Sequence, residues 1–220
     1  MLTASVLLSM SACGPNTDGG SNAQHDMPTI TNGTVKPGSG KMADSIAVLA
    51  KQELEQRQVS GFQREILQRT VESGSMSASD YENAWGMMKR CIVDRGYPRF
   101  APKKTANGIY SFAFGGRDGS DENTPRFAEV HSDCQEEYVD VVSIIYNVQV
   151  GNPNLYADNA EAAVDCLHRE NVVPKNYKIE RFRAAQGSDK DLGFDPFTPE
   201  AQNCLVPNNF EMFDATKPED

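Results

Sequence analysis

The chain has 220 residues, of which 31 are acidic and 21 basic, and its formal net charge at pH 7 is −10. An acidic chain with only a modest basic segment is a poor candidate for binding nucleic acid. The length is sufficient to bury a sizeable hydrophobic core, most simply in a single domain.

The first element is a short apolar run, Ala4 to Leu8, followed by small residues, Cys13 and Gly14. This order resembles the lipobox of bacterial lipoproteins, with Met10 where leucine is usual. The resemblance implies that residues 1–12 are a signal peptide and that Cys13 carries a diacylglycerol at the mature N-terminus. The first basic residue is Lys36, whereas a secretory peptide opens with positive charge. Either the true start lies upstream of residue 1, or the resemblance is accidental and the segment is an ordinary cytosolic N-terminus.

Residues 13–41 are predicted to be a lipidated cysteine and a flexible linker. The segment is rich in Gly, Pro, Ser, Asn and Thr and has no apolar period, so it cannot bury enough surface to order itself. As a random coil it would span roughly 30 Å on a root-mean-square basis. If Cys13 is lipidated, this linker holds the following domain close to a membrane.

Three helices are expected next, at residues 42–58, 62–72 and from Ser77 onward. The third has the clearest pattern, with one continuous apolar stripe. After it, Gly96 supplies a left-handed residue and Pro98 prevents continuation. The stripe consists of Tyr81, Ala84, Trp85, Met88 and Ile92.

Ile109 to Phe114 is aromatic and predicts a short strand or extended loop. Further helices are expected at 133–148, from Asp158 to about 170, and after Thr198-Pro199, where a cap residue precedes proline. Residues 175–186 fit a helix or a strand, and 208–220 read as an acidic tail. We therefore expect a mainly α domain over 42–207, with five to six helices and a short β-prone segment.

The five cysteines indicate the compartment. If Cys13 is lipidated, four remain, which is the number needed for two disulfides in an oxidising environment. The closest two cysteines are 32 positions apart, so a structural metal site is not expected. Three pairings are possible, and the pairing of sequential elements is favoured because these are usually neighbours. The favoured bridges are Cys91–Cys134 and Cys166–Cys204.

The chain also resembles uncharacterised lipoproteins of Gram-positive bacteria over about 130 residues. Those proteins combine a lipobox and a polar linker with an α-rich domain. The resemblance implies a fold and an extracytoplasmic, membrane-anchored location, and it adds no activity or cofactor. It is carried by Tyr81, Trp85, Cys91, Gly96 and Tyr97, then Cys134, Tyr138 and Cys166.

A basic segment at 89–104 interrupts the acidic chain, with six cations against Asp94 alone. Its plain interpretation is a solvated helix end and loop, and the functional one is a contact with lipid headgroups or wall polymer. A binding surface for an envelope protein or polymer is predicted from this segment and its aromatic neighbours. It comprises Tyr97, Arg99, Phe100, Lys103, Lys104 and Tyr110.

Catalytic motifs are not evident, so we expect a non-catalytic binding or accessory module with no cofactor. His131 beside Asp133 could orient a general base for an envelope hydrolase together with Asp118 and Asp121, although a histidine at a helix start is more often a surface or capping residue. A solute-binding component of a transporter is the other alternative. The chain lacks the alternating strand–helix units such receptors need.

Overall fold

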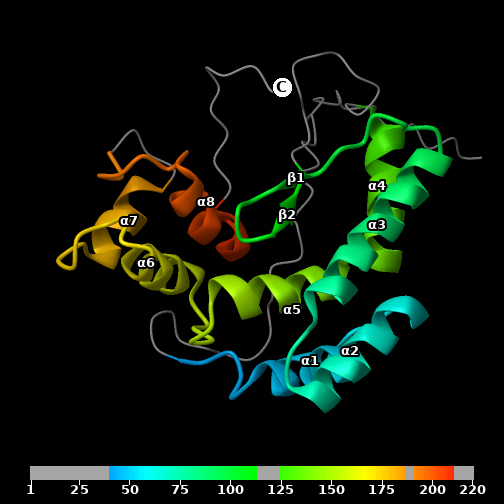
Figure 1. Cartoon of the computed structure of the whole chain (residues 1–220), viewed down its shortest axis with the longest axis horizontal. Coiled ribbons are helices and arrows are strands. Elements are labelled where there is room, and N and C mark those ends of the chain that lie inside the picture. The colour runs from blue at the N-terminus through cyan, green and yellow to red at the C-terminus, as the bar shows by residue number, and fades with distance from the viewer. Residues whose placement is uncertain (1–39, 113–123, 187–190, 211–220) are drawn as a thin grey trace, which may run out of the picture. The chain divides into compact units, whose positions relative to one another are not determined.

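The computed structural model describes residues 40–112, 124–186 and 191–210, and these lie within one compact unit. The predicted signal peptide, Cys13, most of the linker and nearly all of the acidic tail lie outside the described residues. The mainly α prediction is confirmed, with eight α-helices in the described part (Figure 1). Among these described segments, no helix combines the length and apolar character needed to cross a bilayer.

Helix α1 (Ile46–Gln56) packs against α2 (Gly61–Ser73), and α3 (Ala78–Asp94) follows. A side-chain oxygen caps the start of each helix by accepting a bond from the amide three residues later. This satisfies one of the amides that a helix start leaves without a partner. The caps are Ser45, Ser60 and Ser77.

A two-stranded antiparallel hairpin follows α3, built from β1 (Lys103–Lys104) and β2 (Tyr110–Ser111). It confirms extended structure at the start of the predicted 109–114 segment, of which 113 and 114 lie beyond the described residues. The turn closes with Thr105 N–H bonded to the Ile109 carbonyl at 2.8 Å.

The single helix expected at 133–148 is two helices, α4 (Pro125–Tyr138) and α5 (Asp140–Gly151). Helix α4 begins eight residues earlier than predicted, at Thr124-Pro125, the same cap-and-proline signal that starts α8. The helices separate at Val139, whose φ of −131° is not helical. Periodicity alone did not indicate this break, because the buried residues of both helices contribute to one continuous core.

Gln63 of α2 stabilises the junction between α4 and α5 through side-chain hydrogen bonds. Its Nε2 donates to the Glu136 carbonyl at 2.6 Å, and its Oε1 accepts from the Val141 and Val142 amides at 2.8 and 3.2 Å. Ser60 Oγ donates to the neighbouring Glu137 carbonyl at 2.5 Å. These contacts replace backbone bonds lost where one helix stops and the next begins.

The chain continues through α6 (Asn159–Arg169), α7 (Ile179–Ala185), α8 (Pro199–Leu205) and the 3-10 turn η2 (Val206–Asn208). The ambiguous segment 175–186 is thus partly helical. Two hydrophobic clusters result, a larger one formed mainly by α1–α5 and the hairpin, and a smaller one formed by α6–α8. Helix α5 contacts α1 to α4 on one side and α6 and η2 on the other, so it joins the two clusters (Figure 1).

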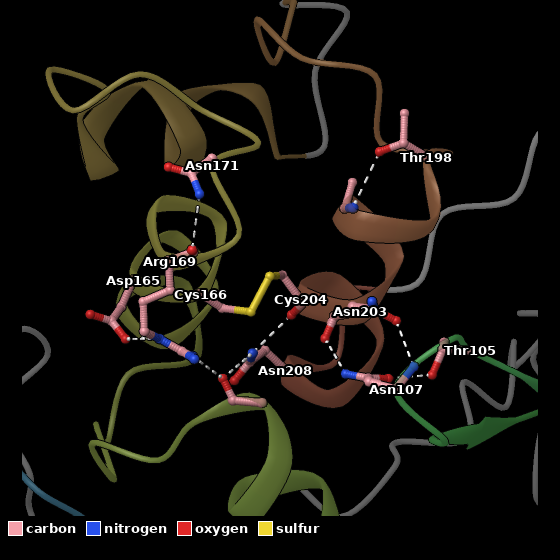
Figure 2. The surroundings of a disulfide bond; sticks show 12 residues. Thr105, Asn107, Asp165, Cys166, Arg169, Asn171, Thr198, Asn203, Cys204 and Asn208 are labelled. Atoms are coloured by element: carbon pink, nitrogen blue, oxygen red, sulfur yellow. Dashed lines mark hydrogen bonds and ion pairs between the residues drawn. A yellow bond between two sulfur atoms is a disulfide. The ribbon is translucent and has the colours of Figure 1, made fainter.

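Both favoured disulfides are present. Cys91–Cys134 joins α3 to α4 in the larger cluster, with Cα atoms 5.9 Å apart. Cys166–Cys204 joins α6 to α8 in the smaller cluster, with Cα atoms 5.4 Å apart (Figure 2). Each hydrophobic cluster therefore contains one covalent crosslink between its helices.

Candidate functional site

Two aromatic residues of the predicted binding surface belong to the core. Tyr97 is 9% exposed and Phe100 is 1% exposed. The Tyr97 ring lies 4.9 Å from the Phe127 ring, and the Phe100 ring lies 4.7 Å from that of Phe112. The prediction was wrong for this pair, because the segment after α3 turns both rings inward to cover the start of α4.

Tyr110 is half-buried against α3. Its amide donates to the Tyr81 hydroxyl at 2.9 Å, and its ring stacks on Trp85 with centroids 5.2 Å apart. The Lys104 ammonium lies 4.9 Å from the centroid of the Tyr110 ring, a distance at which a cation is attracted to the face of the ring. The Tyr110 ring therefore contacts the Lys104 ammonium and contributes little to any exposed surface.

Lys104 is also tied to α3 by an ion pair. Its Nζ lies 2.7 Å from Glu82 Oε1, and the hydrogen bond to that carboxylate raises the pKa of Lys104. The ammonium is fully charged at neutral pH. This contact joins β1 to the second turn of α3, across 22 positions of sequence, and no local pattern indicated Glu82 as the partner.

The cations of the predicted surface remain at the surface. Arg99 and Lys103 are exposed, as are Lys89 and Arg90 on α3. Arg95 is paired with Asp133 of α4 at 2.7 Å. Guanidinium and ammonium groups in such a setting can donate to phosphate or carboxylate oxygens, so the chemistry this region offers is anion binding.

His131 lies inside α4 and is 6% exposed, so the expectation of a surface or capping histidine was wrong. Its ring stacks on Phe112 with centroids 5.3 Å apart and lies 5.8 Å from the Phe127 ring. Burial lowers its pKa to about 4. Apolar surroundings make imidazolium costly, so the ring is neutral at physiological pH.

Asp133, the carboxylate proposed beside His131 for a hydrolase, is engaged by another residue. Its carboxylate lies 2.7 Å from Arg95. Residues two apart on a helix point in different directions, so Asp133 does not face His131. Asp118 and Asp121, the other residues of that hypothesis, lie outside the described residues. His131 is therefore a core residue in the described structure.

A surface depression of about 440 Å³ lies elsewhere, where α2 ends and α3 begins. Arg69 and Asp80 face each other there at 2.6 Å, and this bond lowers the pKa of the Asp80 carboxyl. The two charges neutralise each other. The depression contains none of the predicted surface residues and is lined by Arg69, Glu72, Ser73, Ser75, Ser77 and Asp80.

Within the segments the structure describes, His, Cys, Asp and Glu side chains nowhere gather in a group able to hold a metal ion. Cys91, Cys134, Cys166 and Cys204 are all oxidised, so none offers a thiolate ligand or nucleophile. Asp191, one of these acidic residues, accepts from the Gly193 amide at 2.8 Å and pairs with Arg181 at 3.4 Å.

The fold and site define a disulfide-crosslinked α-helical domain with an exposed basic segment. Comparison with protein-family models, with curated proteins and with solved structures finds no match for this chain.

Proposed function

We propose that the protein is a lipoprotein held on the extracytoplasmic face of the cell membrane by Cys13, where its helical domain serves as a non-catalytic binding module. The observation that carries the proposal is the use of the cysteines. Four of the five form two disulfides. The fifth, Cys13, stands in the segment that resembles a lipobox.

Two features independently support the same compartment. Disulfides persist in oxidising surroundings and are rare in the reducing cytosol. A lipobox-like segment is the sequence expected for export followed by lipidation. Each bridge crosslinks helices within one hydrophobic cluster, and the reducing cytosol would not maintain such bonds.

Binding is favoured over catalysis because the exposed groups of the candidate surface are cations, while the histidine proposed as a base is buried and neutral. Ammonium and guanidinium groups bind anions without needing a change of protonation state. The bound partner should therefore be anionic, such as an acidic envelope protein or an anionic polymer.

The lipid anchor is tested by radiolabelled palmitate incorporation in a bacterial host that processes lipoproteins. Wild-type protein should be labelled and should fractionate with membranes. The Cys13→Ser variant should remain an unlabelled precursor. Continued labelling of that variant would refute the assignment of the anchor to Cys13.

The compartment is tested separately by alkylation of the exported protein under non-reducing conditions, followed by peptide mass mapping. The expected result is no alkylated cysteine among Cys91, Cys134, Cys166 and Cys204. Alkylation of Cys91 or Cys166 in the folded protein contradicts a permanently oxidised domain. Crosslinking in intact cells and recovery of the tagged protein would then identify the bound molecule.

A further inference from the structure

The two disulfides differ in how far solvent reaches them. Cys91 is partly exposed at the edge of the larger cluster. Its bridge partner Cys134 is 0% exposed, and Cys166 and Cys204 of the second bridge are 3% and 0% exposed. Among the four cysteines that the structure describes, Cys91 is therefore the one that a molecule in solution can reach.

The place of Cys91 on α3 explains its exposure. It lies one position before Ile92, the last buried residue of the apolar stripe, and four positions before the exposed Arg95. Residues four apart share one side of a helix, so the Cys91 side chain lies at the margin between core and solvent. Its carbonyl accepts from the Arg95 amide at 3.2 Å, and the exposed area therefore belongs mainly to the side chain.

An exposed ion pair marks the same margin. Arg95 Nη1 lies 2.7 Å from Asp133 Oδ2, and the two side chains are 45% and 56% exposed. Asp133 directly precedes Cys134, which instead lies on the buried face of α4 together with Phe127 and His131. The S–S bond thus runs from a partly exposed residue of α3 to a buried residue of α4.

The second bridge is enclosed. Asn208 Nδ2 donates to the Cys204 carbonyl at 2.8 Å and to the Gly151 carbonyl at 3.3 Å, which holds η2 and the end of α5 beside α8 (Figure 2). On α6, Cys166 lies among buried residues that include Leu167. A reagent therefore reaches Cys166–Cys204 only after the structure opens locally.

We propose that Cys91–Cys134 is a thiol–disulfide exchange site, at which a dithiol attacks Cys91 and reduces the bridge. One thiolate of the dithiol bonds to Cys91 Sγ while the Cys91–Cys134 bond breaks, and Cys134 leaves as a thiolate that takes up a proton. The second thiol of the same molecule, as its thiolate, then attacks the mixed disulfide and releases Cys91, which is also protonated. The dithiol becomes a disulfide, and the protein gains two electrons and two protons.

The exposure of the two sulfur-bearing residues sets the direction of attack. A thiolate arriving from solvent meets Cys91, and the leaving sulfur is that of the buried Cys134. A dithiol is favoured over a monothiol because its second thiol acts within the mixed disulfide, at a high effective concentration. An oxidised Cys91 is the electrophile in this reaction, so the site needs no free thiol in its resting state.

The reduced domain should keep its fold, so that the bridge can close again. The Arg95–Asp133 ion pair still joins α3 to α4. The Tyr97 ring also contacts the Phe127 ring of α4, with centroids 4.9 Å apart. Both thiols therefore stay near each other, and oxidising surroundings return the bridge to its closed state. The inference concerns the folded domain and does not require a lipid on Cys13.

The test uses the full chain carrying Cys13→Ser, which removes the fifth thiol. The folded protein is incubated with dithiothreitol, sampled over time, alkylated and mapped by peptide mass. Alkylation should appear first at Cys91 and Cys134, and Cys166–Cys204 should open at least about tenfold more slowly, because it waits for local opening. Equal rates for the two bridges, or earlier opening of Cys166–Cys204, overturn the proposal.

The same time course in urea is the control for the fold. In the unfolded chain the two bridges should open at similar rates, and a preference that persists there overturns the structural assignment. Transfer of the partly reduced protein to oxidised dithiothreitol should close Cys91–Cys134 again. Loss of the helical circular dichroism signal while that bridge alone is open overturns reversible exchange.

Attack at Cys91 is tested with two single variants in the same background. The remaining Cys91 thiol of Cys134→Ser should be alkylated several times faster than the remaining Cys134 thiol of Cys91→Ser. Equal rates overturn the assignment of attack to Cys91. Circular dichroism shows whether each variant is folded, and the time course with the intact bridges does not depend on them.

The source of the dithiol is distinguished by replacing dithiothreitol with reduced thioredoxin, a protein dithiol. Opening of Cys91–Cys134 by both reagents supports exchange with a protein partner, and opening by dithiothreitol alone supports exchange with a small dithiol. Failure of both to open this bridge first overturns the site. Palmitate labelling is measured separately, so failure of the exchange site is distinguished from failure of the anchor.

Discussion

The side chain of Gln63 bonds backbone groups at the end of α4 and at the start of α5. Its amide group bonds the Glu136 carbonyl and the Val141 and Val142 amides, and the side chain is 1% exposed. Removing it leaves these groups buried without their partners, each at a cost of about 1–3 kcal/mol. Gln63 is therefore among the polar residues on which the fold depends most.

We expect Gln63→Ala to lower the free energy of unfolding by at least about 3 kcal/mol, about 1 kcal/mol or more for each of the three groups, measured by urea denaturation with the disulfides intact. The control is Gln68→Ala, an exposed glutamine on the same helix, which should change stability by less than about 0.5 kcal/mol. Equal effects of the two substitutions would contradict the bridging role of Gln63.

His131 gives the domain a specific pH dependence. Its pKa is lowered from 6.5 to about 4 in the folded state by burial, so between these values the unfolded chain binds the proton more tightly. The stability contribution is fully present above pH 6.5 and is lost as pH falls towards 4. The loss amounts to about 3 kcal/mol at 1.36 kcal/mol per pH unit.

His131→Phe should remove this part of the pH dependence, because phenylalanine suits the contacts with Phe100, Phe112 and Phe127 and does not titrate. The measurement is the difference in unfolding free energy between variant and wild type at pH 7 and at pH 4. The carboxylates titrate in both proteins and cancel in the difference. An unchanged difference between the two pH values would show that His131 is not the responsible group.

At the scale of the elements, each disulfide crosslinks one cluster. Cys91–Cys134 spans 43 positions and Cys166–Cys204 spans 38, and each is worth about 4 kcal/mol in the chain-entropy model. The clusters differ in size, with 23 buried hydrophobic residues in the larger and 11 in the smaller among those the structure describes. The smaller cluster depends more on its bridge.

Replacing Cys166 and Cys204 by alanine should therefore open α6–α8 locally before the rest of the domain unfolds. Amide hydrogen exchange followed by mass spectrometry should show faster exchange in 159–205, with α1–α3 protected as in the wild type. The variant with Cys91 and Cys134 replaced by alanine is measured in the same way, so that the effects of losing each bridge on amide exchange can be compared. Uniformly faster exchange over the whole domain in the first variant would instead indicate a single cooperative unit.

At the scale of the whole described domain, stability depends on how the clusters meet. Asn203 of α8 accepts from the Asn107 amide and Asn107 Nδ2 donates to the Asn203 carbonyl, both at 2.9 Å (Figure 2). Asn208 donates to the Gly151 carbonyl at 3.3 Å and to the Cys204 carbonyl at 2.8 Å. Polar contacts therefore join the hairpin and α5 to α8 and η2.

At Gly151 the end of α5 leaves no room for a side chain beside η2. A methyl group there would lie 2.5 Å from Pro207 Cγ, so Gly151→Ala must displace η2 from the end of α5. We expect a loss of about 1–3 kcal/mol in thermal denaturation, the usual cost of overpacking. Gly61→Ala is the control, because nothing lies within 4 Å of an added methyl group. Wild-type stability in Gly151→Ala would show that the junction is loosely packed.

The sequence alone determined the helical class, the apolar face of α3, the helix starts at Ser77, Asp158 and Thr198, and the favoured disulfide pairing. These are local patterns, or they follow from neighbouring elements lying side by side. The extracytoplasmic location and the lipid on Cys13 remain predictions, which rest on the lipobox-like segment and on the number of cysteines.

Only the tertiary structure decided where α4 ends, which aromatic residues are buried and what surrounds His131. The break at Val139 depends on Gln63, which is 76 positions away in the chain. Tyr97 and Phe100 are core residues because Phe127 and Phe112 meet them across the fold. Each outcome depends on contacts between distant residues, and such contacts leave no period or motif in the local sequence.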